Sequence, residues 1–369
     1  MARVATNENL KKAKKEKNDE FYTILSDIEK ELRHYKKHFK NKVVLCNCDD
    51  PRISNFFHYF SYNFEQLGLR KLITTCYKNQ NPDLFSQHVS EKAIYLEYIG
   101  DKNGNNIPDP NEIDIKYLKG DGDFRSKECI DLLKQADIIV TNPPFSLFRE
   151  YVGQLIEFDK KFLIVGNWNA ISYKEIFKLI KDNKLWIGIN SNRNFSGFIV
   201  PEHYTMYGTE ARVDQKGNRI VSTNNTCWFT NLENEKRSEE LILYKNYDPV
   251  EYPSYINFDA INVDKTNEIP LDYNGLMGVP ITFLDKYNPN QFEIIALGIV
   301  GSIDFSSNRK MEILDKNGKS TKRYTNNAKG TLYRLYDPKK DKSPAFKDAE
   351  TGDLYSSIYA RVIIKNMKL

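Results

Sequence analysis

The sequence predicts an α/β fold followed by a β-rich C-terminal region. Up to about residue 190, short apolar runs alternate with amphipathic stretches, which indicates strands separated by helices. Such alternation is typical of a mainly parallel sheet with helices on both faces. Beyond residue 190 the helical periodicity nearly vanishes, and short β-like runs are separated by polar loops. The 369 residues have room for two domains, which we place at 1–245 and 246–369.

The individual elements follow in order from these runs. We expect strands at residues 43–46, 72–76, 93–98, 137–141, 162–165 and 185–189. We expect helices at 55–67, where Gly68 ends the helix, at 129–135 and at 173–181. The run 226–230 is assigned to the same sheet as a late antiparallel strand, and further strands are expected at 197–200, 293–300 and 359–364.

Composition and charge exclude several classes of protein. The net charge is only +4, so any surface that attracts nucleic acid must be local. No run is long and apolar enough to span a membrane, and the N-terminus lacks the apolar core of a signal peptide. Five scattered cysteines favour reduced thiols in a cytosol. We therefore expect a cytoplasmic protein with no membrane partner.

Two patterns have the spacing of metal sites, but we expect no metal. Cys46 and Cys48 lack a second Cys/His pair at zinc spacing, so a buried strand end is the better interpretation. Residues 101–112 have the acidic spacing of a calcium loop, yet Asn106 stands where that loop needs glycine, and Pro108 follows. We interpret this segment as a polar insertion.

The first 18 residues are basic and contain few apolar side chains. Two interpretations of this arm stay open: a solvated tail, or a segment that contacts phosphate groups of nucleic acid. The second interpretation rests on four of its lysines, Lys11, Lys12, Lys14 and Lys15.

The tetrapeptide Asn142-Pro143-Pro144-Phe145 carries the clearest chemical signal. It lies between an apolar strand and an amphipathic helix, which predicts a tight turn between them. Asn142 offers a side-chain carbonyl, and the prolines stiffen a backbone whose carbonyls are outside a helix ladder. Phe145 offers a flat aromatic face. Two acceptors beside such a face suit a planar base that carries an exocyclic amine.

A second candidate segment is the loop after the strand 43–46. In open α/β sheets, ligands bind beyond the carboxyl ends of the strands, where the strand order reverses. The loop offers Asn47, Asp49 and Asp50, which suit a ligand with a cationic amino-acid end. The alternative is that Asp50 caps a helix that begins at Pro51.

These segments together resemble the amino-methyltransferases. The tetrapeptide resembles their motif IV, and the loop after the first strand resembles motif I in position, although it lacks the usual glycines. Phe21, Tyr22 and Thr23 resemble motif X, and Asp123 with Phe124 resembles motif III. The order X, I, III, IV matches the γ arrangement of adenine-N6 methyltransferases. Cys76 and Tyr77 end the second strand where this class usually has an acid for the ribose hydroxyls, so that contact stays unassigned.

The amino-acid sequences of residues 42–57, 19–23 and 141–146 are similar to the corresponding segments of the EcoRI-type adenine-specific DNA methyltransferases. The resemblance implies a Rossmann-like methyltransferase sheet and S-adenosylmethionine as the methyl donor. It also implies a monomeric bacterial or phage enzyme without an obligate protein partner, which flips its target adenine out of double-stranded DNA. Residues 1–245 would then be the catalytic domain, and 246–369 a target-recognition region. Whether a restriction enzyme accompanies it stays open.

The recognition region offers basic side chains suited to DNA. We expect Arg309, Lys310, Lys322, Arg323 and Lys329 in loops, with Asn308, Asn326 and Asn327 nearby. Arginine suits guanine and asparagine suits adenine in the major groove, while lysine suits phosphate. Ordinary surface charge is the alternative for any one of them.

Two alternative functions stay open. The same turn could serve another planar amine, namely cytosine N4, a ribosomal RNA base or a protein glutamine. A catalytically silent DNA-binding protein is the other alternative, and it would bind S-adenosylmethionine without methyl transfer.

Overall fold

The computed structural model describes residues 22–48, 54–77, 93–105, 108, 112–191, 195–200, 206, 211–222, 225–299, 302–303, 309–326 and 331–369. Phe21, Asp49, Asp50 and the four lysines of the N-terminal arm lie outside these residues. The chain forms two compact units. The N-terminal unit comprises Met1–Ile171 and Leu185–Asn234, and the C-terminal unit comprises Ser172–Lys184 and Glu235–Leu369.

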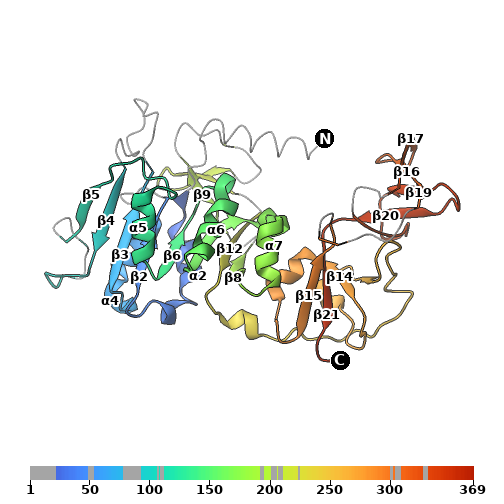
Figure 1. Ribbon diagram of the computed structural model, residues 1–369, viewed down its shortest axis with the longest axis horizontal. Coiled ribbons are helices and arrows are strands. Elements are labelled where there is room, and N and C mark those ends of the chain that lie inside the picture. Colours follow the sequence, from blue (N-terminus) through green and yellow to red (C-terminus); the bar gives the residue numbers. More distant parts are fainter. Residues whose placement is uncertain are drawn as a thin grey trace. The chain divides into compact units, whose positions relative to one another are not determined.

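An eight-stranded sheet is the centre of the N-terminal unit, with the strand order β5-β4-β3-β2-β6-β7-β12-β8 (Figure 1). Its strands, in chain order, are β2 Val43–Cys46, β3 Lys71–Thr75, β4 Ile94–Tyr98, β5 Asp114–Tyr117, β6 Ile138–Thr141, β7 Lys161–Asn167, β8 Trp186–Ser191 and β12 Thr226–Thr230. The late strand β12 is antiparallel to both β7 and β8, which confirms its predicted place and direction.

The sheet is mainly parallel, as predicted, because β4 and β12 alone run against the direction of its other strands, and of these two only β4 was not expected to be antiparallel. Only β3, β2, β6 and β7 pair in parallel with one another, and β4, β5 and β12 join by antiparallel pairing. The burial patterns explain the difference. All four residues of β2 are buried, as in a strand covered on both faces, whereas buried and half-buried residues alternate along β4. Strand β5 was not predicted, because three of its four side chains are exposed and it therefore lacks the apolar run that marks a buried strand.

Helices cover both faces of this sheet. They are α2 Leu25–Leu32, α3 Asn55–Tyr62, α4 Phe64–Leu67, α5 Lys127–Gln135 and α6 Phe148–Glu157. On one face Phe56 of α3 packs edge-on against Trp228, and on the other Phe148 of α6 packs against Phe229, with ring centroids 6.2 and 4.9 Å apart. Consecutive residues of β12 thus face opposite helical layers. None of the described helices combines the length and apolarity of a membrane span.

A second, smaller sheet of the N-terminal unit has the order β1-β9-β11-β10. Its strands are β1 Tyr22–Thr23, β9 Phe198–Val200, β10 Arg212–Val213 and β11 Arg219–Val221. Pairing is antiparallel, with Thr23 opposite Phe198. Residues early in the chain therefore lie beside a strand that follows the main sheet's β8.

The C-terminal unit contains two further sheets. One has the order β13-β14-β21-β15 and the other β17-β16-β19-β20-β18. Their strands are β13 Ile261–Asn262, β14 Met277–Pro280, β15 Phe292–Leu297, β16 Met311–Leu314, β17 Ser320–Thr325, β18 Leu332–Leu335, β19 Phe346–Asp348, β20 Leu354–Ile358 and β21 Arg361–Asn366. Helix α7, Lys174–Lys181, belongs to this unit, and the Lys181 ammonium donates a hydrogen bond to the Ile295 carbonyl in β15 at 2.6 Å.

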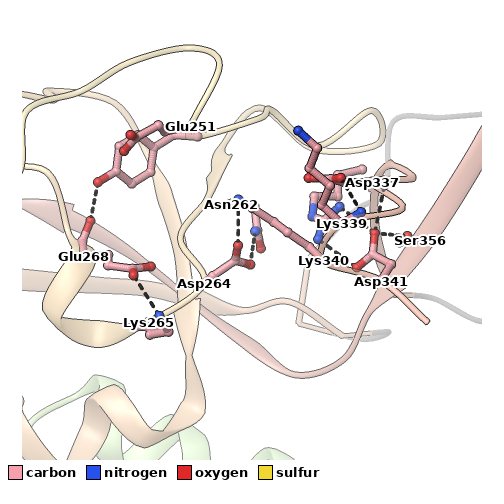
Figure 2. A network of polar contacts seen from close by, with 12 residues as sticks. Glu251, Asn262, Asp264, Lys265, Glu268, Asp337, Lys339, Lys340, Asp341 and Ser356 are labelled. Atoms are coloured by element: carbon pink, nitrogen blue, oxygen red, sulfur yellow. Dashed lines mark hydrogen bonds and ion pairs between the residues drawn. The ribbon is translucent and has the colours of Figure 1, made fainter. Parts of the chain in front are cut away.

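A polar network joins the two C-terminal sheets through the loop after β18. Lys340 forms an ion pair with Asp264, which follows β13, at 3.2 Å (Figure 2). The next residue, Asp341, accepts two hydrogen bonds from the Arg334 guanidinium in β18 and one from the Ser356 hydroxyl in β20. Arg334 is almost fully buried, so this pairing offsets the cost of burying its charge.

The buried carboxylate of Glu31 ties α2 to the end of β8. Its oxygens accept hydrogen bonds from the backbone amides of Ile189 and Asn190 at 2.8 and 2.7 Å, and from the Tyr35 hydroxyl at 3.0 Å. Burial raises the pKa of the Glu31 carboxyl, while the two backbone amides act in the opposite direction. The strand end is therefore held by a group that water does not reach.

We expect Glu31→Ala to lower the free energy of unfolding by about 2–6 kcal/mol, because two half-buried backbone amides lose their acceptor at about 1–3 kcal/mol each. Glu31→Gln keeps one acceptor oxygen and should lose less. Urea unfolding measures the change, and Glu29→Ala, an exposed glutamate on the same helix, is the matched control. Equal unfolding midpoints for Glu31→Ala and Glu29→Ala would contradict this role.

Candidate active site

The strand order of the main sheet reverses between β2 and β6. The chain runs from β2 to β3 on one side, and it later returns to place β6 on the other side of β2. The carboxyl ends of β2 and β6 flank this reversal, and ligands of open α/β sheets bind at such a position. Asn47 follows β2 and Asn142 follows β6, so the sheet brings two of the predicted site residues to one place.

Buried hydrogen bonds join these two strand ends. The Thr141 hydroxyl, at the end of β6, donates to the Asn47 carbonyl, and the Tyr151 hydroxyl of α6 donates to the Asn47 side-chain oxygen. Thr141 and Tyr151 are fully buried, and Asn47 is nearly so. Asn47 is therefore held by both its backbone and its side chain, which makes it a positioned part of the site.

The predicted turn follows directly. Asn142 is 7% exposed, Pro143 is buried, and Pro144 and Phe145 are half-buried. Phe145 begins a short 3₁₀ helix, Phe145–Leu147, and the Pro144 carbonyl accepts a hydrogen bond from the Leu147 amide at 3.0 Å. The Pro144 carbonyl is thus engaged within the turn, and the Pro143 carbonyl stays the candidate for the predicted second acceptor.

An aromatic contact connects this turn to the N-terminal strand. The ring of Phe145 meets that of Phe198 edge-on, with centroids 6.2 Å apart. Phe198 lies in β9 opposite Thr23, and the Thr23 carbonyl accepts a hydrogen bond from the Asn55 side chain at 2.8 Å. The structure thereby gathers Tyr22-Thr23, the start of α3 and the turn, segments that are far apart in the sequence.

The loop that contains Asp123 approaches the end of β3. Gly122 has φ +79°, and a Cβ there would lie 2.2 Å from the Cys76 carbonyl oxygen, so only glycine allows this approach. Asp123 itself is engaged by its neighbour, because the Arg125 guanidinium donates to both carboxylate oxygens at 2.9 and 2.7 Å. This pairing lowers the pKa of the Asp123 carboxyl. A ligand amine would have to share or displace Arg125.

Asp121 is a candidate that the sequence analysis missed. No acid stands directly after β3 in the sequence, where Cys76 and Tyr77 follow, but the Tyr77 hydroxyl hydrogen-bonds the Asp121 side chain at that strand end. Burial raises the pKa of the Tyr77 hydroxyl, and the carboxylates of Asp121 and Asp123 raise it further. Asp121 comes from a segment far from β3 in the sequence. The one feature of the sequence that could have indicated it is Gly122 between Asp121 and Asp123.

Phe124 connects the loop that contains Asp123 to helix α6. Its ring is buried edge-on against Tyr151 with centroids 5.0 Å apart, and its carbonyl accepts a hydrogen bond from Gln154 at 3.2 Å. Phe124 therefore packs the loop onto α6, next to the tyrosine that holds Asn47.

The residues predicted to read DNA lie in the C-terminal unit. Arg323 is exposed in β17, together with Lys322, so the expectation that both lie in loops was wrong. The alternation of apolar and polar residues that marks a strand is absent there, since β17 reads Ser-Thr-Lys-Arg-Tyr-Thr. Arg309 and Lys310 directly precede β16. Asn308, Asn327 and Lys329 lie outside the described residues.

Comparison with known proteins identifies the relatives of this chain. A family model described as adenine-specific methyltransferase EcoRI matches residues 9–367. The Type II methyltransferase M.EcoRI of Escherichia coli is 58% identical over 297 residues, which are 80% of this chain and 90% of that protein. M.MgeORF184P of Mycoplasma genitalium and M.MpnI of Mycoplasma pneumoniae, both Type II methyltransferases, are 42% and 41% identical and each cover 77% of this chain and 84% of their own length. No solved structure matches the chain.

The match spans both compact units, from the N-terminal arm to the last strand. It includes the turn after β6, the loop before α5 and the strand β1, which the fold gathers at the reversal of strand order. The chain therefore belongs to the EcoRI family of adenine-specific methyltransferases, as its motifs and their order had indicated.

Proposed function

We propose that this enzyme, an adenine-specific DNA methyltransferase by its family, methylates N6 of an adenine flipped out of double-stranded DNA. The observation that carries the proposal is the placement of Asn142 directly beyond β6, at the reversal of strand order and beside the held Asn47. Family membership decides between adenine and cytosine N4, and it separates the chain from the RNA, protein and silent alternatives.

The turn supplies what an exocyclic amine needs. The Asn142 side-chain oxygen and the Pro143 carbonyl would accept the two amine hydrogens, which directs the nitrogen lone pair toward the methyl donor. The half-buried ring of Phe145, steadied by Phe198, would stack on the base. Flipping costs a few kcal/mol, and stacking on one aromatic ring returns about 1–3 kcal/mol. Positioning of the amine then supplies much of the rate.

The residues at the strand ends fit S-adenosylmethionine. The donor's positive charge suits a pocket with acids, its adenine amine needs an acceptor, and its ribose hydroxyls need another. Asn47, Asp121, Asp123 and the segment Tyr22-Thr23 are described residues that could hold these groups, and Phe21, Asp49 and Asp50 join them from the sequence. S-adenosylmethionine supplies an activated methyl group when bound. The protein contributes orientation and exclusion of water.

The remaining parts of the proposal concern the whole protein. We assign catalysis to residues 1–245 and target recognition to 246–369, with Arg309, Lys310 and Arg323 near the DNA and the N-terminal lysines on phosphates. The enzyme would act as a monomer in the cytoplasm, where bacterial DNA lies. Its Type II relatives make an accompanying restriction enzyme a reasonable partner in the cell.

The test of the function is methylation itself. Plasmid DNA exposed to the wild-type enzyme and S-adenosylmethionine should acquire N6-methyladenine at one recurring sequence, detected by sequencing of modified bases. Asn142→Ala should lower the rate about 10²–10³-fold, by analogy with the loss of one positioned polar group, while DNA affinity changes little. Near-normal turnover by this variant would remove Asn142 from the proposed mechanism.

Phe145→Ala should make base flipping less favourable by about 1–3 kcal/mol, because the acceptors stay while the stacking face is lost. A fluorescent adenine analogue at the target position reports the flipped population. Phe39→Leu, at a ring buried against Phe60 in the same unit, serves as the control for general disturbance of the fold. A flipped signal equal to that of wild type would assign Phe145 to packing alone.

Asp121→Asn should weaken binding of S-adenosylmethionine about five- to twentyfold, measured by calorimetry without DNA, if its carboxylate accepts from the ribose hydroxyls. Asp123→Asn tests the adenine contact in the same way. Asp131→Asn, at an exposed acid on α5, is the matched control. If both variants bind the donor as the control does, the pocket does not include this loop.

A further inference from the structure

The hairpin of β16 and β17 concentrates the positive charge of the chain. Residues 309–326, which we call the basic ribbon, contain six basic and two acidic side chains. Their net charge of +4 equals that of the whole 369-residue protein, so the remaining residues are neutral in sum. The basic side chains are Arg309, Lys310, Lys316, Lys319, Lys322 and Arg323. A local field of this kind attracts a polyanion even though the net charge is small.

The second strand of the ribbon contributes no fully buried residue to the fold. β17 lies at the edge of its sheet and pairs with β16, and none of its six residues, all of them described, is buried. β16 anchors the ribbon, because Met311 is buried and Ile313 packs against the hydrophobic cluster of Met311, Tyr333, Phe346 and Tyr355. β17 thus projects both of its faces beyond this core.

Protection of a sheet edge is the simpler explanation for charge on β17. Charged side chains, lysine above all, discourage edge-to-edge pairing of sheets. That explanation does not account for Tyr324, which is 53% exposed in the same strand. Aromatic residues favour β-structure, so a tyrosine on this edge would promote the strand pairing that the charges discourage. Tyr324 instead carries the Lys310 ammonium over its ring, 4.9 Å from the centroid. The ribbon therefore presents basic and aromatic groups together, as nucleic-acid surfaces do.

The conformation of the ribbon is set before any partner binds. At its tip the Asp315 carboxylate accepts hydrogen bonds from the amides of Asn317 and Lys319 at 2.8 and 2.9 Å, and Gly318 has φ +77°. The Ser343 hydroxyl supports the tip by donating to the Lys316 carbonyl at 3.1 Å. A rigid tip loses little conformational entropy on binding.

A bulge redirects the side chains of β17. Ile313 pairs with Arg323, but the next residue, Leu314, pairs with Ser320, so Thr321 and Lys322 are extra residues on this strand. The Thr321 hydroxyl closes the bulge by donating to the Ile313 carbonyl at 2.6 Å, and Lys322 has φ +57°, which is unusual for a residue with a side chain. Bulges of this kind re-aim side chains at functional positions.

We propose that the basic ribbon enters the major groove of the DNA and carries part of the sequence recognition. This proposal rests on the proposed function and names the element that performs its recognition step. A two-stranded ribbon fits the major groove, which is about 12 Å wide. Arg323 contacts a base edge, since its guanidinium forms no ion pair with the described residues, while Lys316, Lys319 and Lys322 contact phosphates.

Arg309 has a different part in this arrangement. Its guanidinium lies 3.5 Å from the Asp348 carboxylate and 3.4 Å from the Tyr355 hydroxyl, which ties the base of the ribbon to β19 and β20. Arg309 thus orients the ribbon and is not a base-reading residue.

The first arm of the test measures how binding depends on salt, with a duplex oligonucleotide of arbitrary sequence. The triple variant Lys316→Gln, Lys319→Gln, Lys322→Gln should bind more weakly, and the slope of log affinity against log salt should fall by about 2–3, because each lost phosphate contact removes about 0.9. The control triple Lys339→Gln, Lys342→Gln, Lys365→Gln removes the same charge from exposed positions of the same unit. It should change the slope by less than one.

The second arm measures discrimination between the duplex that the wild-type enzyme methylates and the same duplex with one base pair changed. Arg323→Ala should reduce the preference at one position about tenfold to hundredfold, while binding of S-adenosylmethionine and the unfolding temperature stay at the wild-type values. Lys365→Ala, an exposed cation in β21, is its control and should keep the preference.

The outcomes separate this proposal from the function on which it rests. If the ribbon triple matches the control triple and Arg323→Ala keeps its preference while wild type still methylates adenine, the ribbon lies outside the groove and the function stands. If wild type methylates no adenine, the function fails, and the salt slopes of the two triples still decide whether the ribbon contacts DNA.

Discussion

The hydrogen bonds that converge on Asn47 hold together the two strand ends on which the site depends. The Thr141 hydroxyl binds the Asn47 backbone and the Tyr151 hydroxyl binds its side chain. Because all three groups are buried, each bond would leave an expensive unpaired polar atom if it broke. The distance between the loop after β2 and the turn after β6 is therefore set by the sheet itself. If the methyl donor binds at the loop after β2 and the target amine at the turn after β6, the sheet sets the distance between them.

Two buried carboxylates of α2, Asp27 and Glu31, hold the segments that lead to the aromatic contact of Phe198 with Phe145. Asp27 accepts hydrogen bonds from the Ser196 amide and hydroxyl at 2.7 and 2.8 Å, which fixes the approach to β9. Glu31, one turn later in α2, holds the end of β8. Phe198 follows Ser196 closely and steadies Phe145, so one helix positions a ring that we expect to stack on the flipped base. Helix α2 thus positions segments of the site through its contacts with Ser196 and the end of β8.

In the C-terminal unit, the arrangement of two small sheets depends on polar contacts between them. Lys340 is in a partly exposed ion pair with Asp264, and the next residue, Asp341, is paired with the buried Arg334 (Figure 2). Paired charges of this kind impose a specific geometry more than they add stability. The geometry leaves β17 projecting from a sheet that β16 anchors. A rigid base with a charged, exposed edge is well suited to a surface whose partner is a polyanion.

The sequence by itself determined the class of fold, the family and the strand, turn and helix around residues 142–145, to which we assign the chemistry. These features are local, because a strand, a proline-stiffened turn and a helix each depend on neighbouring residues. It also placed the late antiparallel strand β12, whose five residues are all buried. Only the tertiary structure decided the antiparallel direction of β4, the position of Asp121 at the end of β3 and the engagement of Asp123 by Arg125. It likewise showed that Arg323 lies in a strand. Each of these features depends on which segments pair across long distances in the sequence. A polar edge strand such as β5 or β17 also lacks the alternation of apolar and polar residues from which a strand is predicted.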